Sequence, residues 1–299
     1  MSAPEDVLRI GAELAAAAAS LQRETCAALE EADGTGRFSA DAWERPGGGG
    51  GIARVLQEGA VFEKAGVNFS DVRGEVPAAL ASRLPGHGSE FLAAGLSVVV
   101  HPCSPMIPTA HANVRFLARG GTAWFGGGAD LTPHYLFEDD CIHFHRALRS
   151  LCERHFPGRH PELKRAADAY FFLPHRGEHR GVGGIFFDGL GEDLPRTLAF
   201  ARELPRAFLD AYLPIVARRR DAPWGEEERR WQEIRRGRYV EFNLVHDRGT
   251  LFGLETRGRI ESVLMSLPPR VRWRYDHRPA PGSREAALVE VLLHPRDWA

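Results

Sequence analysis

Alternating polar and apolar side chains mark several β-strands along the chain. Residues 111–116 read His-Ala-Asn-Val-Arg-Phe, a period of two that is typical of a strand with one buried face. In the run 95–101, Ser97 and His101 share one face, and residues 124–135 predict a third short strand. Because hairpin-length connections join these three runs, we expect neighbouring antiparallel strands rather than a parallel βαβ repeat.

Apolar residues at helical spacing dominate most of the remaining chain. They predict helices over residues 5–31, 138–156, 161–173, 192–219, 226–236 and 284–293. An apolar run at 181–189 predicts a buried strand that stops at Asp188, and the alternation over 238–245 predicts another strand. Residues 260–269 are expected either to close the sheet or to begin a further helix.

These elements predict a single α+β domain over residues 1–299, with a large, mainly antiparallel β-sheet flanked by α-helices on both sides and a helical lead-in at about residues 1–20. A chain of 299 residues with 43% hydrophobic content can bury a core of this size. Its net charge of -2 gives no electrostatic reason to expect nucleic acid or an anionic membrane as a partner. The four cysteines show no C-x-x-C spacing, and no run approaches the ~18 apolar residues of a membrane span. We therefore expect a soluble, cytoplasmic protein without a membrane span.

Polar side chains on the predicted strands form a stripe suited to ligand binding. If the first two strands pair as neighbours, His101 and His111 face each other near the loop that connects them. Ser97, Asn113 and Arg115 then extend the same face. Imidazole, amide and guanidinium groups together favour an anionic ligand that accepts hydrogen bonds. An ordinary solvated sheet face is the alternative interpretation.

Further histidines and one carboxylate are candidates for chemistry. His143 and His145 lie two residues apart on a predicted helix, about 200° from one another, so only one of them can face the stripe. With His175, histidines from separate elements would suit a divalent metal, although no spacing matches a short metal-binding signature. Surface or core histidines are the alternative. Asp188 ends an apolar strand, where side chains often face a cleft, although a lone carboxylate at this place is more often a turn residue.

Five long segments have sequences, and an order along the chain, that are typical of one enzyme family. They are AGVNFSDVRGE (65–75), VVHPCSPMIPTAHANVRF (99–116), WFGGGADLTPHY (124–135), GVGGIFFDGL (181–190) and RGRYVEFNLVHDRGTLFGLETRGRIESVLMSLPP (236–269). They resemble oxygen-dependent coproporphyrinogen III oxidases, and the resemblance runs over roughly residues 25–299. Motifs of this length are far more specific than a short glycine pattern.

This resemblance implies an enzyme of haem (porphyrin) biosynthesis that oxidatively decarboxylates the ring A and B propionates of coproporphyrinogen III to vinyl groups. The reaction uses O2 and gives protoporphyrinogen IX, CO2 and H2O2 or water. The resemblance also implies a cytoplasmic homodimer, with an interface that includes residues 239–274, and no organic cofactor. The reduced macrocycle is electron-rich enough to react with O2 itself, so the protein has mainly to position it and to manage protons.

The resemblance assigns roles to individual residues. It implies that His111 is the proton donor and that Asp188 is the carboxylate that holds the pyrrole N–H groups. The implied substrate contacts are Ser97, Asn113, Val114, Arg115, Arg257, Gly258 and Arg259. In some bacterial members the positions of His101, His111, His145 and His175 are read as ligands of a divalent metal, often manganese.

The chain departs from the family pattern at several positions. Gly189 follows Asp188 where a second carboxylate is usual, and Arg257 stands where bacterial members often carry glycine. His134 and His246 occupy places that are usually aromatic. Two other functions stay open on the sequence alone: a metal-dependent oxygenase that uses the histidines, and a non-catalytic tetrapyrrole-binding protein.

Overall fold

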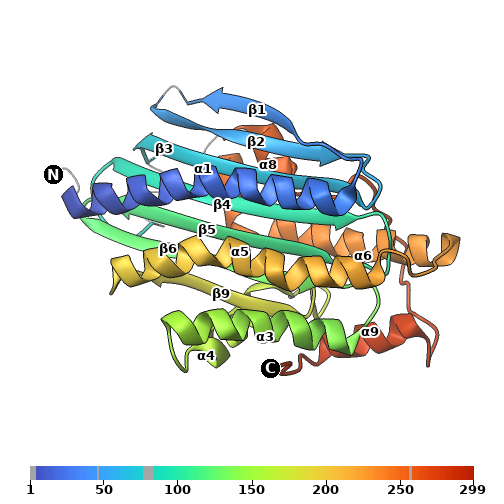
Figure 1. Ribbon diagram of the computed structural model, residues 1–299. Helices are drawn as coiled ribbons and strands as arrows, with labels where there is room; N and C mark the ends of the chain where they lie inside the picture. The colour runs from blue at the N-terminus through green and yellow to red at the C-terminus, as the bar shows by residue number, and fades with distance from the viewer. Residues whose placement is uncertain (1–4, 46, 77–83, 256–257) are drawn as a thin grey trace.

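A seven-stranded antiparallel sheet forms the centre of the protein, in a computed structural model that describes residues 5–45, 47–76, 84–255 and 258–299 (Figure 1). Its strands, in their order across the sheet, are β1 Ser39–Glu44, β2 Gly49–Gln57, β3 Phe62–Glu75, β4 Glu90–Pro102, β5 Thr109–Arg119, β6 Thr122–Thr132 and β9 Gly183–Leu190. A separate pair, β7 Phe172–Leu173 and β8 Glu178–His179, precedes β9. The expected run of neighbouring antiparallel strands around His111 is therefore confirmed.

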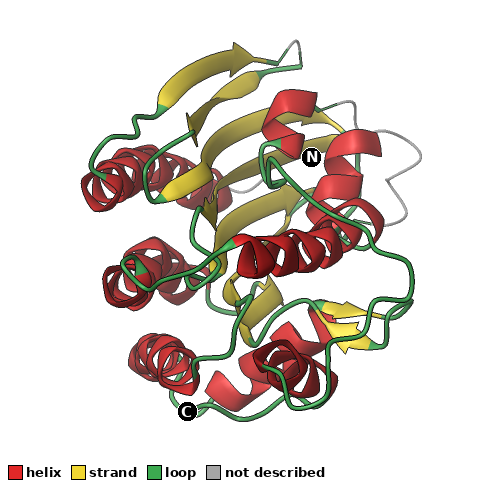
Figure 2. Cartoon of the chain, turned by 90° about the vertical axis from the view of Figure 1, so that its right-hand side faces the viewer, coloured by secondary structure: helices red, strands yellow, loops and turns green. Residues whose placement is uncertain are grey.

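Helices cover both faces of this sheet. They are α1 Glu5–Asp33, α3 Glu138–His155, α4 His160–Tyr170, α5 Leu194–Arg219, α6 Glu226–Val245, α7 Arg248–Glu255, α8 Ile260–Leu264 and α9 Arg284–Leu293. Three of them, α1, α5 and α3, lie side by side across one face, while α6, α7 and α8 lie on the other (Figure 1 and Figure 2). This confirms the expected α+β fold. Within the described ranges, every helix is too short or too polar to span a bilayer.

The alternation in β5 divides its side chains between the two layers. Ala112, Val114 and Phe116 are buried on the side of α1 and α5, where they belong to the main hydrophobic core. Removal of this apolar surface from water is what fixes which way the strand faces. The intervening side chains, which begin with His111, point to the opposite face, below α6 to α8. The predicted one-sided burial of this strand is confirmed.

The register of β4 and β5 differs from the expected one by two residues. His111 lies opposite Val99, so the prediction that it faces His101 is wrong. His101 instead comes level with Thr109, and its Nδ1 lies 3.3 Å from the Thr109 hydroxyl oxygen. The physical reason is that each strand must bury its apolar face, and this requirement fixes only which residues share a face, not which residues stand opposite each other.

Residues 238–245 form the last turns of α6, and the strand predicted for them is wrong. Tyr239, Phe242 and Asn243 are buried at a spacing of three and four residues, which is typical of one helix face. The short alternation in this segment fits both patterns, and the preceding helix continues through it. For residues 260–269 the helical alternative is correct, because α8 begins there.

The carboxylate of Asp33 ties the end of α1 to the loop that leads into β3. Its oxygens accept hydrogen bonds from the backbone N–H groups of Gly36, Ala60, Val61 and Phe62, at 2.6 to 3.0 Å. Burial alone would raise the pKa of Asp33, but these donors outweigh it and lower the pKa to about 2. The folded protein therefore favours the ionised carboxylate.

Asp33→Asn should lower the free energy of unfolding at neutral pH by at least about 2 kcal/mol. Because the folded-state pKa lies below the ordinary value of 3.8, this stability is present above that value and is lost as the pH falls towards 2. Urea titrations should therefore show the difference from wild type shrinking as the pH falls below about 5. Asp210→Asn, exposed on α5, is the control and should be neutral throughout. A difference for Asp33→Asn that does not depend on pH would contradict this account.

Candidate functional site

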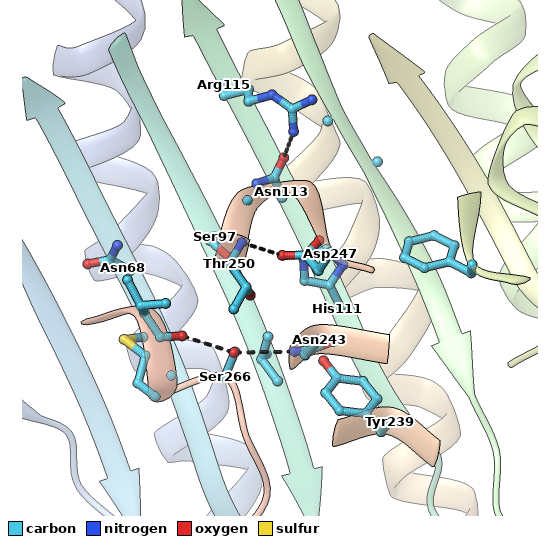
Figure 3. Close-up of a pocket in the computed structure, with 18 of the residues that line it drawn as sticks. Asn68, Ser97, His111, Asn113, Arg115, Tyr239, Asn243, Asp247, Thr250 and Ser266 are labelled. Atoms are coloured by element: carbon cyan, nitrogen blue, oxygen red, sulfur yellow. Dashed lines mark hydrogen bonds between the residues drawn. The ribbon is translucent and has the colours of Figure 1, made fainter. Parts of the chain in front are cut away.

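A cavity lies between the sheet and the helices α6, α7 and α8 (Figure 3). Strands β3 to β6 form its floor, and the helices form the opposite wall. The polar residues that line it include Asn68, Ser97, His111, Asn113, Arg115, Arg180, Tyr239, Asn243, Asp247, Thr250, Ser262 and Ser266. Of the polar stripe predicted from the sequence, Ser97, His111, Asn113 and Arg115 therefore belong to the floor of a concave site, and His101 does not.

Strand register arranges part of this floor as a row of polar groups. Asn68 pairs with Ser97, and Ser97 pairs with Asn113, on three neighbouring strands. Directly opposite residues point to the same face, with their Cβ atoms about 5 Å apart. The predicted contacts Ser97 and Asn113 thus lie side by side, and the structure adds Asn68 to them.

His111 is held by a chain of buried polar groups. Asp130 lies directly opposite it on β6, and Asp130 Oδ1 is 2.8 Å from His111 Nδ1. The second oxygen, Oδ2, accepts a hydrogen bond from Arg180 at 2.6 Å, and Arg180 also donates to Oδ1 of Asn243 at 3.0 Å. Because a carboxylate only accepts, the His111 ring carries a proton on Nδ1, and Nε2 is the nitrogen left for the cavity.

The ion pair behind His111 is almost completely buried. The side chains of Asp130 and Arg180 are each 2% exposed. The rings of Phe171, Tyr239 and Phe242 surround the guanidinium group, with centroids at 4.3 to 4.6 Å. Burial alone would raise the pKa of Asp130, but Arg180 and the bonded imidazole outweigh it and lower the pKa. Asp130 is therefore ionised, and an imidazole fixed in this way suits proton transfer.

Asp188 forms ion pairs at the rim of the cavity. Its Oδ1 lies 3.1 Å from Nη2 of Arg115, both side chains being 31% exposed, and its Oδ2 accepts from Arg248 at 3.3 Å. A Cβ atom at Gly126 would lie 2.7 Å from Asp188 Oδ1 and 2.8 Å from the Arg115 guanidinium, so the glycine leaves room for the pair. Strand β9 continues past Asp188 to Leu190, and Asp188 lies outside the cavity lining.

Asp247, which was not a candidate from the sequence, supplies a carboxylate to the cavity wall itself. Its Oδ1 accepts a hydrogen bond from the Tyr170 hydroxyl at 2.8 Å. Its Oδ2 accepts from the backbone N–H of Thr250 at 2.7 Å, as Figure 3 shows. These contacts fix the side chain at the start of α7. Each carboxylate oxygen can accept a further hydrogen bond, so Asp247 can meet N–H donors of a ligand.

Three further predicted substrate contacts are not part of the cavity lining. The Val114 side chain is 1% exposed and points into the core on the other side of the sheet. Gly258 and Arg259 also lie outside the lining, and Arg259 forms an ion pair with Asp41 of β1. A fourth predicted contact, Arg257, lies outside the described residues.

The four histidines predicted as metal ligands have four different surroundings. His101 is fully buried, with its ring nitrogens next to a hydroxyl and a backbone carbonyl. His145 lies on α3, across the sheet from the cavity, and contacts a backbone carbonyl, whereas His175 is exposed and pairs with a glutamate of α6. Nowhere in the described ranges do three His, Cys, Asp or Glu side chains gather as metal ligands. Together with His111, whose Nδ1 bonds Asp130, these residues do not fit one metal site.

Four residues of the site, Asp130, Arg180, Asn243 and Asp247, were not predicted from the sequence. The sequence does contain an indication for Asp130. It is a charged residue within the mostly apolar run of the predicted strand 124–135, and a charge at such a place is uncommon. Asn243 and Asp247 belong to or follow the segment mistaken for a strand. Arg180 lies in a connection before β9, and no local pattern distinguishes it from other arginines.

The arrangement combines a fixed imidazole, a row of amides and a hydroxyl, an arginine and a carboxylate around one cavity. These groups can bind a molecule that carries both carboxylate and N–H groups, and they can exchange a proton with it. The sequence matches the coproporphyrinogen III oxidase family over residues 13–298, which is nearly the whole chain. The chain therefore belongs to the coproporphyrinogen III oxidase family, whose members act in haem biosynthesis.

Proposed function

We propose that this chain is an oxygen-dependent coproporphyrinogen III oxidase. It converts the ring A and B propionates of its substrate to vinyl groups, and it gives protoporphyrinogen IX, CO2 and H2O2 or water. The observation that carries the proposal is His111, fixed by Asp130 and Arg180 on the floor of a cavity that also presents Arg115 and Asp247. Coproporphyrinogen III carries carboxylates and pyrrole N–H groups, and this set of side chains offers a partner to each.

The reaction requires a proton at the place where it occurs. Each –CH2–CH2–COO⁻ group becomes –CH=CH2 and releases CO2, one proton and two electrons. Reduction of O2 to H2O2 takes up two electrons and two protons, so the change at each propionate consumes one net proton. His111 suits this delivery, because Asp130 holds Nδ1 and leaves Nε2 to take up a proton from solvent and pass it on in the cavity. Since the porphyrinogen itself supplies the electrons, we expect no organic cofactor.

For the pyrrole N–H groups, we propose Asp247 in place of Asp188. Asp247 lines the cavity, and its hydrogen bonds leave acceptor capacity on both oxygens. Asp188 lies at the rim and is already paired with Arg115 and Arg248. The forked guanidinium of Arg115 suits a propionate, so a bound propionate would compete there with Asp188.

We further propose a cytoplasmic homodimer with an interface that includes residues 239–274. Four apolar side chains on this part of α6, α7 and α8 are exposed: Leu244, Val245, Leu254 and Ile260. The three helices are neighbours, and a second copy that packed on them would remove these side chains from water. The four cysteines are free thiols, as expected in a reducing compartment.

Metal-stripped protein incubated under air with coproporphyrinogen III should form protoporphyrinogen IX, and the same reaction without O2 should form none. Chromatography of the oxidised porphyrins measures both. Metal removal should leave the rate unchanged, because other protein groups already hold the histidines predicted as ligands.

Two other results of this experiment would each contradict a different part of the proposal. Product that appears only after manganese is restored would assign a metal to this reaction and contradict the metal-independent mechanism. Quenching of tryptophan fluorescence by the porphyrinogen, without any product under air, would favour a non-catalytic tetrapyrrole-binding protein.

A further inference from the structure

Tyr239 presents a buried hydroxyl group to the cavity. The residue lies on α6, is 2% exposed and lines the cavity beside Asn243 (Figure 3). The Arg180 guanidinium packs on its ring at 4.4 Å, and the His101 ring meets it edge-on at 5.0 Å. The Tyr239 hydroxyl has no hydrogen-bond partner among the described residues. Because buried hydroxyl groups are rarely left unpaired, this one is placed for a ligand.

The hydrogen bonds of Asn243 and the protonation of Tyr239 show what kind of ligand atom the Tyr239 hydroxyl can bind. The Asn243 amide does not accept the Tyr239 hydrogen, because its Oδ1 already accepts from Arg180 and its Nδ2, which donates to the Ser266 hydroxyl at 3.3 Å, can only donate. Burial raises the pKa of Tyr239, although Arg180 and the nearby Asn243 amide oppose this, so the side chain stays a phenol at neutral pH. Its O–H hydrogen is thus available, and the ligand atom that meets it is an acceptor.

Tyr239, on the helical wall, lies at the same end of the cavity as His111 on the floor. Arg180 connects the two, because it packs on the Tyr239 ring and donates to Asp130, which holds His111. Arg115, in contrast, is four residues further along β5, or about 13 Å of extended strand, and it is paired at the rim. A carboxylate that reacts at His111 therefore needs a donor other than Arg115.

We propose that Tyr239 is a further substrate-binding residue, which donates a hydrogen bond to the propionate carboxylate that reacts beside His111. This rests on the proposed function, because the pyrrole N–H groups of a porphyrinogen only donate, and the propionates are its strong acceptors. A phenol orients the carboxylate without adding a positive charge. Since the carboxylate loses its charge as CO2 leaves, a cation at this place would stabilise the starting state more than the transition state and slow the reaction.

The replacement Tyr239→Phe removes one oxygen and keeps the ring against Arg180 and His101. Measured without O2, the Kd for coproporphyrinogen III should rise about 10- to 100-fold. The Kd for protoporphyrinogen IX should stay unchanged, because this product lacks the two propionates that react. Urea unfolding should show little loss of stability, because the hydroxyl donates no hydrogen bond within the part of the chain that the structure describes.

Tyr212→Phe is a matched control on the other side of the sheet. Tyr212 is fully buried on α5, and its hydroxyl donates to the backbone carbonyl of Pro108 at 3.0 Å. Its replacement should therefore lower stability and leave the Kd of both porphyrinogens unchanged. We therefore expect Tyr239→Phe to change only the binding of coproporphyrinogen III, and Tyr212→Phe to change only the free energy of unfolding.

An equal loss of affinity for both porphyrinogens in Tyr239→Phe, or an unchanged Kd for coproporphyrinogen III, would overturn this inference and leave the proposed function intact. Wild-type protein that neither binds nor converts coproporphyrinogen III under air would instead overturn the proposed function, and the inference with it.

Discussion

Asp130→Asn should lower kcat with coproporphyrinogen III by about 10³-fold or more, while the Kd of the porphyrinogen changes little. The carboxylate of Asp130 fixes the proton on Nδ1 of His111 and thereby the orientation of the ring. An amide can donate as well as accept, so the replacement no longer defines the tautomer or the orientation of the ring. Single-turnover formation of the vinyl product, with binding measured separately without O2, gives both quantities.

The same replacement leaves the guanidinium of Arg180 buried without its counter-charge, which costs about 3 to 5 kcal/mol of stability. The double variant Asp130→Asn with Arg180→Met removes that charge and retains a side chain that packs well between aromatic rings. We expect it to regain most of the stability lost in urea unfolding, but none of the lost rate. A double variant with wild-type kcat would show that Asp130 serves folding and not catalysis.

The side of the site that lies on β5 could be predicted from the sequence, because alternation alone tells which residues share a face. His111, Asn113 and Arg115 do line one cavity. Their partners could not be predicted, because alternation leaves the register between strands undefined. A shift of two residues keeps every side chain on its face while it changes all the pairs, and this is how Val99 replaces His101 as the β4 residue opposite His111.

The part of the site that lies on α6 could not be predicted, because residues 238–245 were expected to form a strand and not a helix. Residues 238–245 alternate for only eight positions, too few to separate a strand from one face of a helix. Burial decides the matter in the folded protein, where Tyr239 and Asn243, four residues apart, both point to the cavity. A strand would have placed them on one face as well, but not at the distance of one helical turn.

The four histidines predicted as metal ligands lie apart because their elements belong to different layers of the fold. Helical geometry correctly shows that His143 and His145 cannot share a site, yet it cannot tell on which side of the sheet their helix lies. Since α3 packs beside α5, His145 is separated from the cavity by the sheet itself. Burial lowers the pKa of His145 to about 3, so it stays neutral as a core residue.

Asp247→Asn should lower kcat/KM for coproporphyrinogen III by about 10²- to 10³-fold, because hydrogen bonds from pyrrole N–H groups to a half-buried carboxylate in the cavity wall lose their charge assistance. Asp188→Asn should change it by no more than about 10-fold, because its partners at the rim are partly exposed and water can replace them. Steady-state assays of the two variants, side by side, compare the two carboxylates under one set of conditions.

The comparison isolates the charge, since both replacements keep the shape of the side chain. In Asp247→Asn, the amide oxygen of the new side chain would still accept from the backbone N–H of Thr250, so α7 should keep its start, and circular dichroism checks this. If Asp188→Asn lowered kcat/KM more than Asp247→Asn, Asp188 would be the residue that binds the pyrrole N–H groups, and the macrocycle would have to bind at the rim. Equal effects would mean that the substrate spans both positions, with Arg115 released from Asp188 to bind a propionate.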